Sequence, residues 1–158
     1  MRKLLATGAA IAALVVFSAP AFAAGAGAVS QTMTIKDATL PPSGILGPCA
    51  PPGTLVSAVD VNAIFHATVL TSGVGAGTGW FTGTMQGQGT AVTPAGVTYT
   101  GPFAVWFGAN NNLQNDQMAS TFAVQLRAAD GSTLDLHAAF EANNTPSGQA
   151  NLVMQFSC

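Results

Sequence analysis

The residues best suited to catalysis lie in the segment 133–142, where Asp135, His137 and Glu141 alternate with apolar residues. Alternate side chains of a β-strand point to the same side, so these three would share one face. A neutral imidazole beside a carboxylate can act as a general base or bind a metal. His66, in another alternating segment, is predicted to lie on the same side and completes the candidate catalytic group. No nucleophile motif or bracketed metal spacing accompanies them, so the alternative is a set of ordinary solvent-facing polar residues.

Three further residues are candidates for binding. Trp80 and Trp106 could stack on sugar rings, because an exposed indole offers a flat apolar surface. Arg127 could hold an anion and is predicted to lie on the same side as His137, one strand away. The alternative for both tryptophans is half-buried packing.

The segment 110–116 is rich in side-chain oxygens, and Asn110, Asn112 and Asp116 are candidate ligands for calcium. The segment carries one carboxylate, whereas calcium loops usually supply more negative charge. The competing interpretation is a solvated turn rich in asparagine. We expect no cofactor, and no metal site beyond this candidate.

The start of the chain predicts a secretory signal peptide over residues 1–23. Two basic residues precede an apolar run over 4–17, and Ala21-Phe22-Ala23 is a small-x-small cleavage pattern. The apolar run is shorter than the ~20 residues that span a bilayer, which argues against a membrane anchor. We therefore expect cleavage after Ala23, secretion, and no stable membrane insertion afterwards.

Removal of the signal peptide would leave few charges. Lys36 and Arg127 would be the only basic residues against six acidic ones, a net charge of −4. Binding to nucleic acid requires several basic contacts to phosphates, and binding to anionic lipid requires a polybasic stretch. Both classes of partner are excluded by this composition.

The two cysteines predict a disulfide. Cys49 and Cys158 both lie in the exported part, and an even count in an oxidising compartment argues for pairing. The bond would tie the C-terminus to the proline-rich segment 48–52. A catalytic or metal-binding thiol is the alternative, but neither cysteine has a second ligand at zinc spacing.

The exported chain predicts one all-β domain over 30–158, preceded by a flexible segment over 24–29. Short alternating runs are separated by clusters of Gly, Pro, Asn and Asp, and no long helical pattern occurs. We expect eight strands, at 30–36, 54–59, 63–71, 80–92, 97–107, 118–128, 133–142 and 149–157.

The alternation also assigns side chains to faces. One face gathers the apolar residues and is the predicted core: Phe65, Val69, Tyr99, Phe103, Val105, Phe107, Phe122, Val124, Leu126, Leu134, Leu136, Ala138, Phe140, Leu152, Met154 and Phe156. Sequential strands with short turns favour an up-and-down or closed antiparallel barrel, with a two-sheet sandwich as the alternative. An outer-membrane barrel would carry aromatic girdles, which this composition does not resemble.

Several short motifs follow one another in a recognisable order: Pro48-Cys49, Phe65-His66-Ala67-Thr68, Phe81-Thr82-Gly83-Thr84, Tyr99-Thr100-Gly101-Pro102-Phe103, Trp106-Phe107-Gly108 and Asp130-Gly131-Ser132-Thr133-Leu134. With these motifs and its terminal cysteine, the chain from about Cys49 onward resembles a family of small secreted proteins of unknown function from high-GC Gram-positive bacteria. The resemblance implies export and a β-rich fold. It implies no activity, substrate or cofactor.

Two classes of function stay open at this stage. The first is a non-enzymatic binding or interaction domain for a small apolar molecule, a glycan or another protein. The second is a small secreted enzyme that uses His137 with Asp135 or Glu141. The lack of a catalytic signature favours the first class. The oligomeric state is left open, since a low charge permits self-association without requiring it.

Overall fold

The computed structural model describes residues 27–43, 47–112, 114–145 and 150–158. The predicted signal peptide lies outside these ranges. The described residues form seven strands and one short 3-10 helix: β1 (Ala28–Ser43), η1 (Gly47–Cys49), β2 (Leu55–Leu70), β3 (Gly79–Val92), β4 (Thr98–Asn112), β5 (Asn115–Ala128), β6 (Thr133–Asn144) and β7 (Ala150–Ser157). Within these ranges, no helix is both long and apolar enough to cross a membrane.

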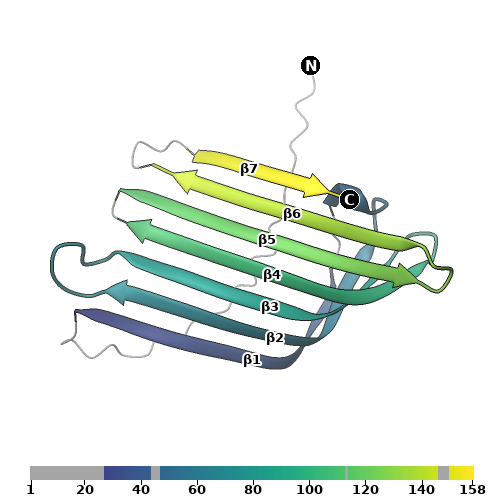
Figure 1. Ribbon diagram of the computed structural model, residues 1–158, viewed down its shortest axis with the longest axis horizontal. Helices are drawn as coiled ribbons and strands as arrows, with labels where there is room; N and C mark the ends of the chain where they lie inside the picture. Colours follow the sequence, from purple (N-terminus) through teal and green to yellow (C-terminus); the bar gives the residue numbers. More distant parts are fainter. Residues whose placement is uncertain (1–26, 44–46, 113, 146–149) are drawn as a thin grey trace, which may run out of the picture.

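All seven strands belong to one antiparallel sheet in the order of the chain, from β1 to β7 (Figure 1). The all-β, up-and-down architecture is therefore confirmed. The closed barrel is wrong, because β1 and β7 are the two edges of the sheet and do not pair with each other. The two-sheet sandwich is wrong as well, because the described strands form a single sheet.

The strands predicted at 54–59 and 63–71 are one continuous strand, β2, so the sheet has seven strands in place of eight. β2 continues through Asp60, where the sequence predicts a break. Asp60 adopts a positive φ of 53°, and the pairing of β2 with β3 shifts register between Val59 and Asn62. An aspartate tolerates this left-handed conformation better than most residues, and an extra residue bends a strand without ending it. What the sequence suggests as a turn is therefore a bulge.

A matching irregularity lies in the neighbouring strand. Asp37 in β1 has a φ of 51°, and the pairing of β1 with β2 shifts between Ile35 and Ala38. The backbone N–H of Asp37 donates to the side-chain oxygen of Asn62 at 3.4 Å, which joins the two bulges. Figure 1 shows the ends of β1 and β2 beyond these points turning behind the rest of the sheet.

The turned ends of β1 and β2 fold against one face of the sheet, here called the inner face. The core lies between this face and the turned ends. Its buried members come from five strands: Ala58, Val61, Ala91, Phe103, Val124, Leu126, Leu134 and Leu136. Leu126 is fully buried. Five of them, Phe103, Val124, Leu126, Leu134 and Leu136, belong to the core predicted from the alternation, whereas Ala58, Val61 and Ala91 were not predicted.

Burial on the inner face is uneven, and here the predicted core is wrong in part. Leu152, Met154 and Phe156 of β7 lie on the inner face but are 58%, 53% and 46% exposed, and Val69 is 43% exposed. The turned ends of β1 and β2 cover one end of the sheet, and β7 lies beyond their reach. Its eight residues are all exposed.

Three phenylalanines pack together on the inner face away from the main core. The rings of Phe65, Phe81 and Phe107 have centroids 5.3 to 5.9 Å apart. Gly83 lies under two of them, and a Cβ atom there would come within 2.7 Å of the Phe65 ring. The glycine thus allows the aromatic rings of the flanking strands to close over β3.

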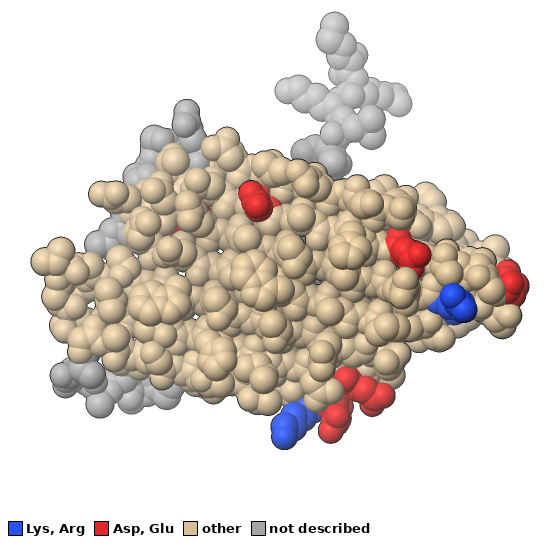
Figure 2. Space-filling model, in the orientation of Figure 1, with Lys and Arg blue, Asp and Glu red and all other residues tan. Residues whose placement is uncertain are grey.

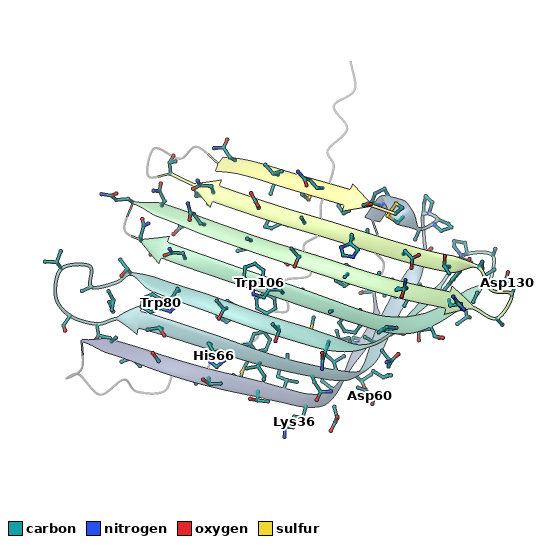
Figure 3. The ribbon with its side chains drawn as sticks, in the orientation of Figure 1. Lys36, Asp60, His66, Trp80, Trp106 and Asp130 are labelled. Carbon is teal, nitrogen blue, oxygen red and sulfur yellow. A yellow bond between two sulfur atoms is a disulfide. The ribbon has the colours of Figure 1, made fainter. Side chains whose placement is uncertain are left out.

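A disulfide joins Cys49 and Cys158, as predicted, with their Cα atoms 5.3 Å apart. Cys49 belongs to η1, which follows the β1 edge, and Cys158 follows β7 at the opposite edge. The disulfide is visible beside the C-terminus in Figure 3. One end of the open sheet is therefore held by a covalent bond in place of a closing pair of strands.

The turn between β5 and β6 contains a carboxylate whose titration can be tested. The hydroxyl and the backbone N–H of Ser132 donate to Asp130 at 2.6 and 2.9 Å, and these bonds lower the pKa of Asp130 below its ordinary value of 3.8. The stabilisation is present above the ordinary pKa and is lost as the pH falls through the lowered one. We expect Ser132→Ala to raise the pKa of Asp130, measured by NMR titration. An unchanged pKa would contradict the role of this hydroxyl.

Candidate functional site

The polar candidates share the side of the sheet opposite the core, here called the outer face. The strand register places Trp80, Trp106, His66, Glu141, His137, Asp135 and Arg127 on this side, as the alternation predicts. Figure 2 looks onto this face, which is largely uncharged. Its charged side chains gather toward one end and the lower margin, apart from one acidic residue near the upper edge.

Two tryptophans dominate one half of the outer face (Figure 3). Trp80 and Trp106 are 49% and 44% exposed and belong to the adjacent strands β3 and β4. The ring of Trp106 lies over Gly108, where a Cβ atom would approach it to 3.1 Å. Gly108 pairs with Thr82, two residues from Trp80, so the Trp106 ring reaches along β4 toward the second tryptophan.

The two indoles border a shallow hollow of about 550 Å³, here called the tryptophan hollow. Besides the two indoles, its outer-face lining includes Gly108, Ala119 and Val153, and its polar members are Thr82, Asn110, Gln117, Glu141, Asn143 and Asn151. Pairing across β3 to β7 produces this set, because Trp80, Asn110, Gln117, Asn143 and Asn151 form one continuous row. The hollow therefore combines two flat apolar surfaces with amide donors and acceptors.

One lining residue has an unsatisfied group. The side-chain oxygen of Asn143 is buried and makes no hydrogen bond to any residue that the structure describes. A buried acceptor without a partner is uncommon in folded proteins and calls for a ligand, a water or a local role.

A second hollow of about 710 Å³ lies on the outer face where the sheet bends. Asp135 and His137 line it together with the amides Asn62, Gln86, Gln88 and Gln125, and Ala104 and Ala123 leave space at its floor. In the described part of the chain, the side chains of Asp135 and His137 form no hydrogen bond or ion pair. They share a hollow but are not aligned as an acid–base pair.

The other candidate catalytic residues lie far from His137. His66 belongs to β2, four strand spacings from β6 or ~19 Å, and its Nδ1 is hydrogen-bonded to the Thr32 hydroxyl at 2.8 Å. Glu141 is four residues from His137 along β6, ~13 Å away. The four residues predicted as one catalytic group therefore share a face without sharing a site.

Arg127 is also separated from the aromatic candidates. It pairs with Thr100 and Thr133 at the far end of β5. Ten residues, or ~33 Å of strand, separate it from Gln117 in the tryptophan hollow. An anion held by Arg127 would therefore not contact either indole.

The candidate calcium ligands do not converge. The solvated turn predicted at 110–116 is wrong in its extent, since β4 continues to Asn112 and β5 begins at Asn115, which pairs with Asn112. Asn110 and Asp116 lie on opposite faces of this hairpin, and Asp116 accepts a hydrogen bond from Asn111. The Asn112 side-chain oxygen accepts from the backbone N–H of Asn115 at 2.8 Å. Among the described residues, no three His, Cys, Asp or Glu side chains could hold a metal together.

Comparisons with protein-family models, with curated proteins and with solved structures find no match. The resemblance to small secreted proteins of high-GC Gram-positive bacteria thus stays a prediction from the short motifs quoted above.

Sequence reasoning missed the amides that accompany the tryptophans. Gln117, Asn143 and Asn151 lie in segments that seemed to be loops or turns, or in a strand considered for its apolar residues only. The alternation along each of their strands places all three side chains on the outer face. The sequence could predict this face, but it could not predict the strand register that aligns the three residues with Trp80.

Proposed function

We propose that this protein is a secreted, non-enzymatic binding module whose outer face takes a neutral glycan. The observation that carries the proposal is the tryptophan hollow, in which two half-exposed indoles on adjacent strands stand among neutral polar side chains. Large exposed aromatic residues rimmed by polar ones mark binding surfaces in proteins of this size.

The chemistry of the hollow matches that of a sugar chain. A pyranose ring has a face of C–H groups that can lie against an indole, and a rim of hydroxyls that both donate and accept hydrogen bonds. Trp80 and Trp106 supply the flat surfaces. Asparagine and glutamine side chains offer donors and acceptors together, which suits hydroxyls better than a charged side chain does.

Charge limits the glycan to a neutral one. Of the residues that line the tryptophan hollow, Glu141 is charged and none is basic. Lys36 and Arg127 are the two basic residues of the described chain, and Arg127 lies at the far end of the sheet. A sulfated or uronic-acid sugar would therefore meet a carboxylate and no counter-charge.

Binding is preferred to catalysis because the candidate catalytic group is dispersed. Asp135 and His137 share the hollow at the bend, whereas Glu141 and His66 are elsewhere on the face. General acid–base chemistry needs its groups within hydrogen-bond reach of one reacting centre. The outer face offers an extended surface, which suits a polymer that is held and released unchanged.

Removal of either indole tests the proposal. We expect Trp80→Ala and Trp106→Ala each to weaken binding about tenfold, because a stacked aromatic contact and its burial contribute on the order of 1–2 kcal/mol. Binding would be measured by calorimetry against hexasaccharides of cellulose, xylan, chitin, mannan and starch. Gly108→Val should give a similar loss, since its side chain displaces the Trp106 ring.

Ile64→Ala is the matched control. Ile64 is 46% exposed on the same face, in the row of Trp106 but at β2, outside the tryptophan hollow. Its truncation removes apolar surface without touching the two indoles. Equal losses in Ile64→Ala and Trp106→Ala, or no binding to any of the five sugars, would contradict the proposal.

A further inference from the structure

The edge formed by β7 pairs with no described strand, and its neighbours there are η1 and the Cys49–Cys158 disulfide at its C-terminal end. All eight residues from Ala150 to Ser157 are exposed, and no described strand pairs with the side of β7 that faces away from β6. The strand contains no charged residue and no proline, and its pairing with β6 runs without a register shift. It carries four large apolar side chains, each about half exposed: Leu152, Val153, Met154 and Phe156.

The opposite edge is built differently. β1 carries Lys36 and the pair Pro41-Pro42, and its pairing with β2 shifts register three times after Ile35. Charged residues, prolines and bulges are the devices by which proteins stop an edge strand from pairing with another chain. The same sheet thus protects one edge and leaves the other ready to pair.

We propose that β7 pairs antiparallel with β7 of a second copy, so that two sheets join into one across a two-fold axis. In an antiparallel pair, residues directly opposite each other lie on the same face. To keep the inner faces of both sheets on one side, the register must therefore pair even-numbered residues with even-numbered ones and odd-numbered residues with odd-numbered ones. Centring on Met154 achieves this from Asn151 to Ser157. Met154 then faces Met154 of the second copy, and Leu152 faces its Phe156.

A second copy fits this edge better than another occupant for two reasons. An antiparallel strand pair is self-complementary, which is what a two-fold interface between identical subunits requires. No charge on β7 opposes its own image. All eight residues are exposed and half of them are large and apolar, so apolar side chains of the two copies come into contact across the axis.

The arrangement has a consequence for the outer face. Asn151 and Val153 line the tryptophan hollow and belong to β7 itself. In the paired form, the tryptophan hollows of both copies open on the same side of one continuous sheet. The dimer does not depend on what these hollows bind, so its test is separate from that of the glycan.

Engineered cysteines test the register. Met154→Cys places two thiols opposite each other across the axis, at the Cα separation of 4.4–6.8 Å that a disulfide accepts. We expect a covalent dimer on a non-reducing gel after mild oxidation. Val153→Cys is the matched control, because residue 153 opposes residue 155 of the second copy and its two thiols lie too far apart to join.

Sedimentation of the disulfide-bonded wild-type chain provides the second measurement. We expect a dimer, and Met154→Lys should raise the dimer dissociation constant at least about tenfold because two like charges would then face each other. A wild-type chain that sediments as a monomer up to about 100 µM, far above the roughly micromolar constant of a weak standard interface, would overturn the proposal. Equal cross-linking of the Val153→Cys and Met154→Cys variants would also overturn the proposal. So would a native mass spectrum that shows a monomer with a small apolar molecule bound to it.

Discussion

Replacing Cys49 and Cys158 with serine is expected to lower the free energy of unfolding by about 4 kcal/mol. The bond closes a loop with a sequence separation of 109 residues, for which the chain-entropy model gives about 4–5 kcal/mol. The open sheet adds a second reason, because no pair of described strands joins the β1 and β7 edges. Urea unfolding of the double serine variant and of the oxidised wild type measures the difference.

The fold itself should survive the loss of the disulfide. The six strand pairs from β1–β2 to β6–β7 do not involve either cysteine, and the buried core lies on strands that stay paired. We expect the far-ultraviolet circular dichroism of the variant to match that of the wild type at low temperature. Reduction of the wild type is the control, since it should lower the urea midpoint by the same amount. An unchanged midpoint would contradict the stabilising role of the bond.

Gly101→Ala is expected to destabilise the protein by about 3 kcal/mol or more, the upper range for forcing extra volume into a packed interior. Gly101 in β4 lies against β5, and a Cβ atom there would overlap the backbone oxygen of Gln125. A backbone atom in the middle of a sheet cannot rotate away as a side chain can. The two strands would have to separate beside the buried residue Leu126.

Gly89→Ala is the matched control for this substitution. Gly89 pairs directly with Gly101 across β3 and β4 and lies on the same face. A Cβ atom there would meet its nearest neighbour, in the Leu126 side chain, at 3.5 Å, which is an ordinary contact. We expect its effect to stay within about 1 kcal/mol, since alanine also reduces the entropy of the unfolded chain. Similar urea midpoints for the two variants would show that the strands at Gly101 are not in contact.

The two surfaces proposed for binding follow from one property of the sheet, its single layer. The turned ends of β1 and β2 cover part of the inner face, and the rest of the sheet stays accessible from both sides. The outer face presents indoles and amides, whereas β7 presents an unpaired backbone with apolar side chains. The first suits a neutral sugar polymer, and the second suits a strand of identical sequence.

Local patterns in the sequence were enough for several features of the fold. The alternation of Phe122, Val124 and Leu126 with polar residues placed each side chain on its face, because the period of two is a property of the strand itself. The turn at 94–96 also follows from local preference, and Gly96 there adopts a positive φ of 80°. The disulfide followed from the count of cysteines and their predicted export.

Two errors arose where one residue type suits two structures. An aspartate in left-handed conformation fits a turn or a bulge equally well, so the sequence around Asp60 did not distinguish a new strand from a bent one. The run of asparagines at 110–112 is equally compatible with a loop or with strand ends. In both cases the pairing with neighbouring strands decided the outcome, and this pairing is a long-range contact.

The sequence by itself thus determined the class of fold, the face of the alternating residues in β4, β5 and β6, and the partner of each cysteine, since these depend on local periodicity and on composition. Only the tertiary structure decided that the sheet stays open, that β7 is left uncovered, and that three amides line up with Trp80 while His66 and Glu141 stay apart from His137. These features depend on strand register and on the bend at Asp37 and Asp60. Both are set by contacts between residues distant in the chain, which no local pattern records.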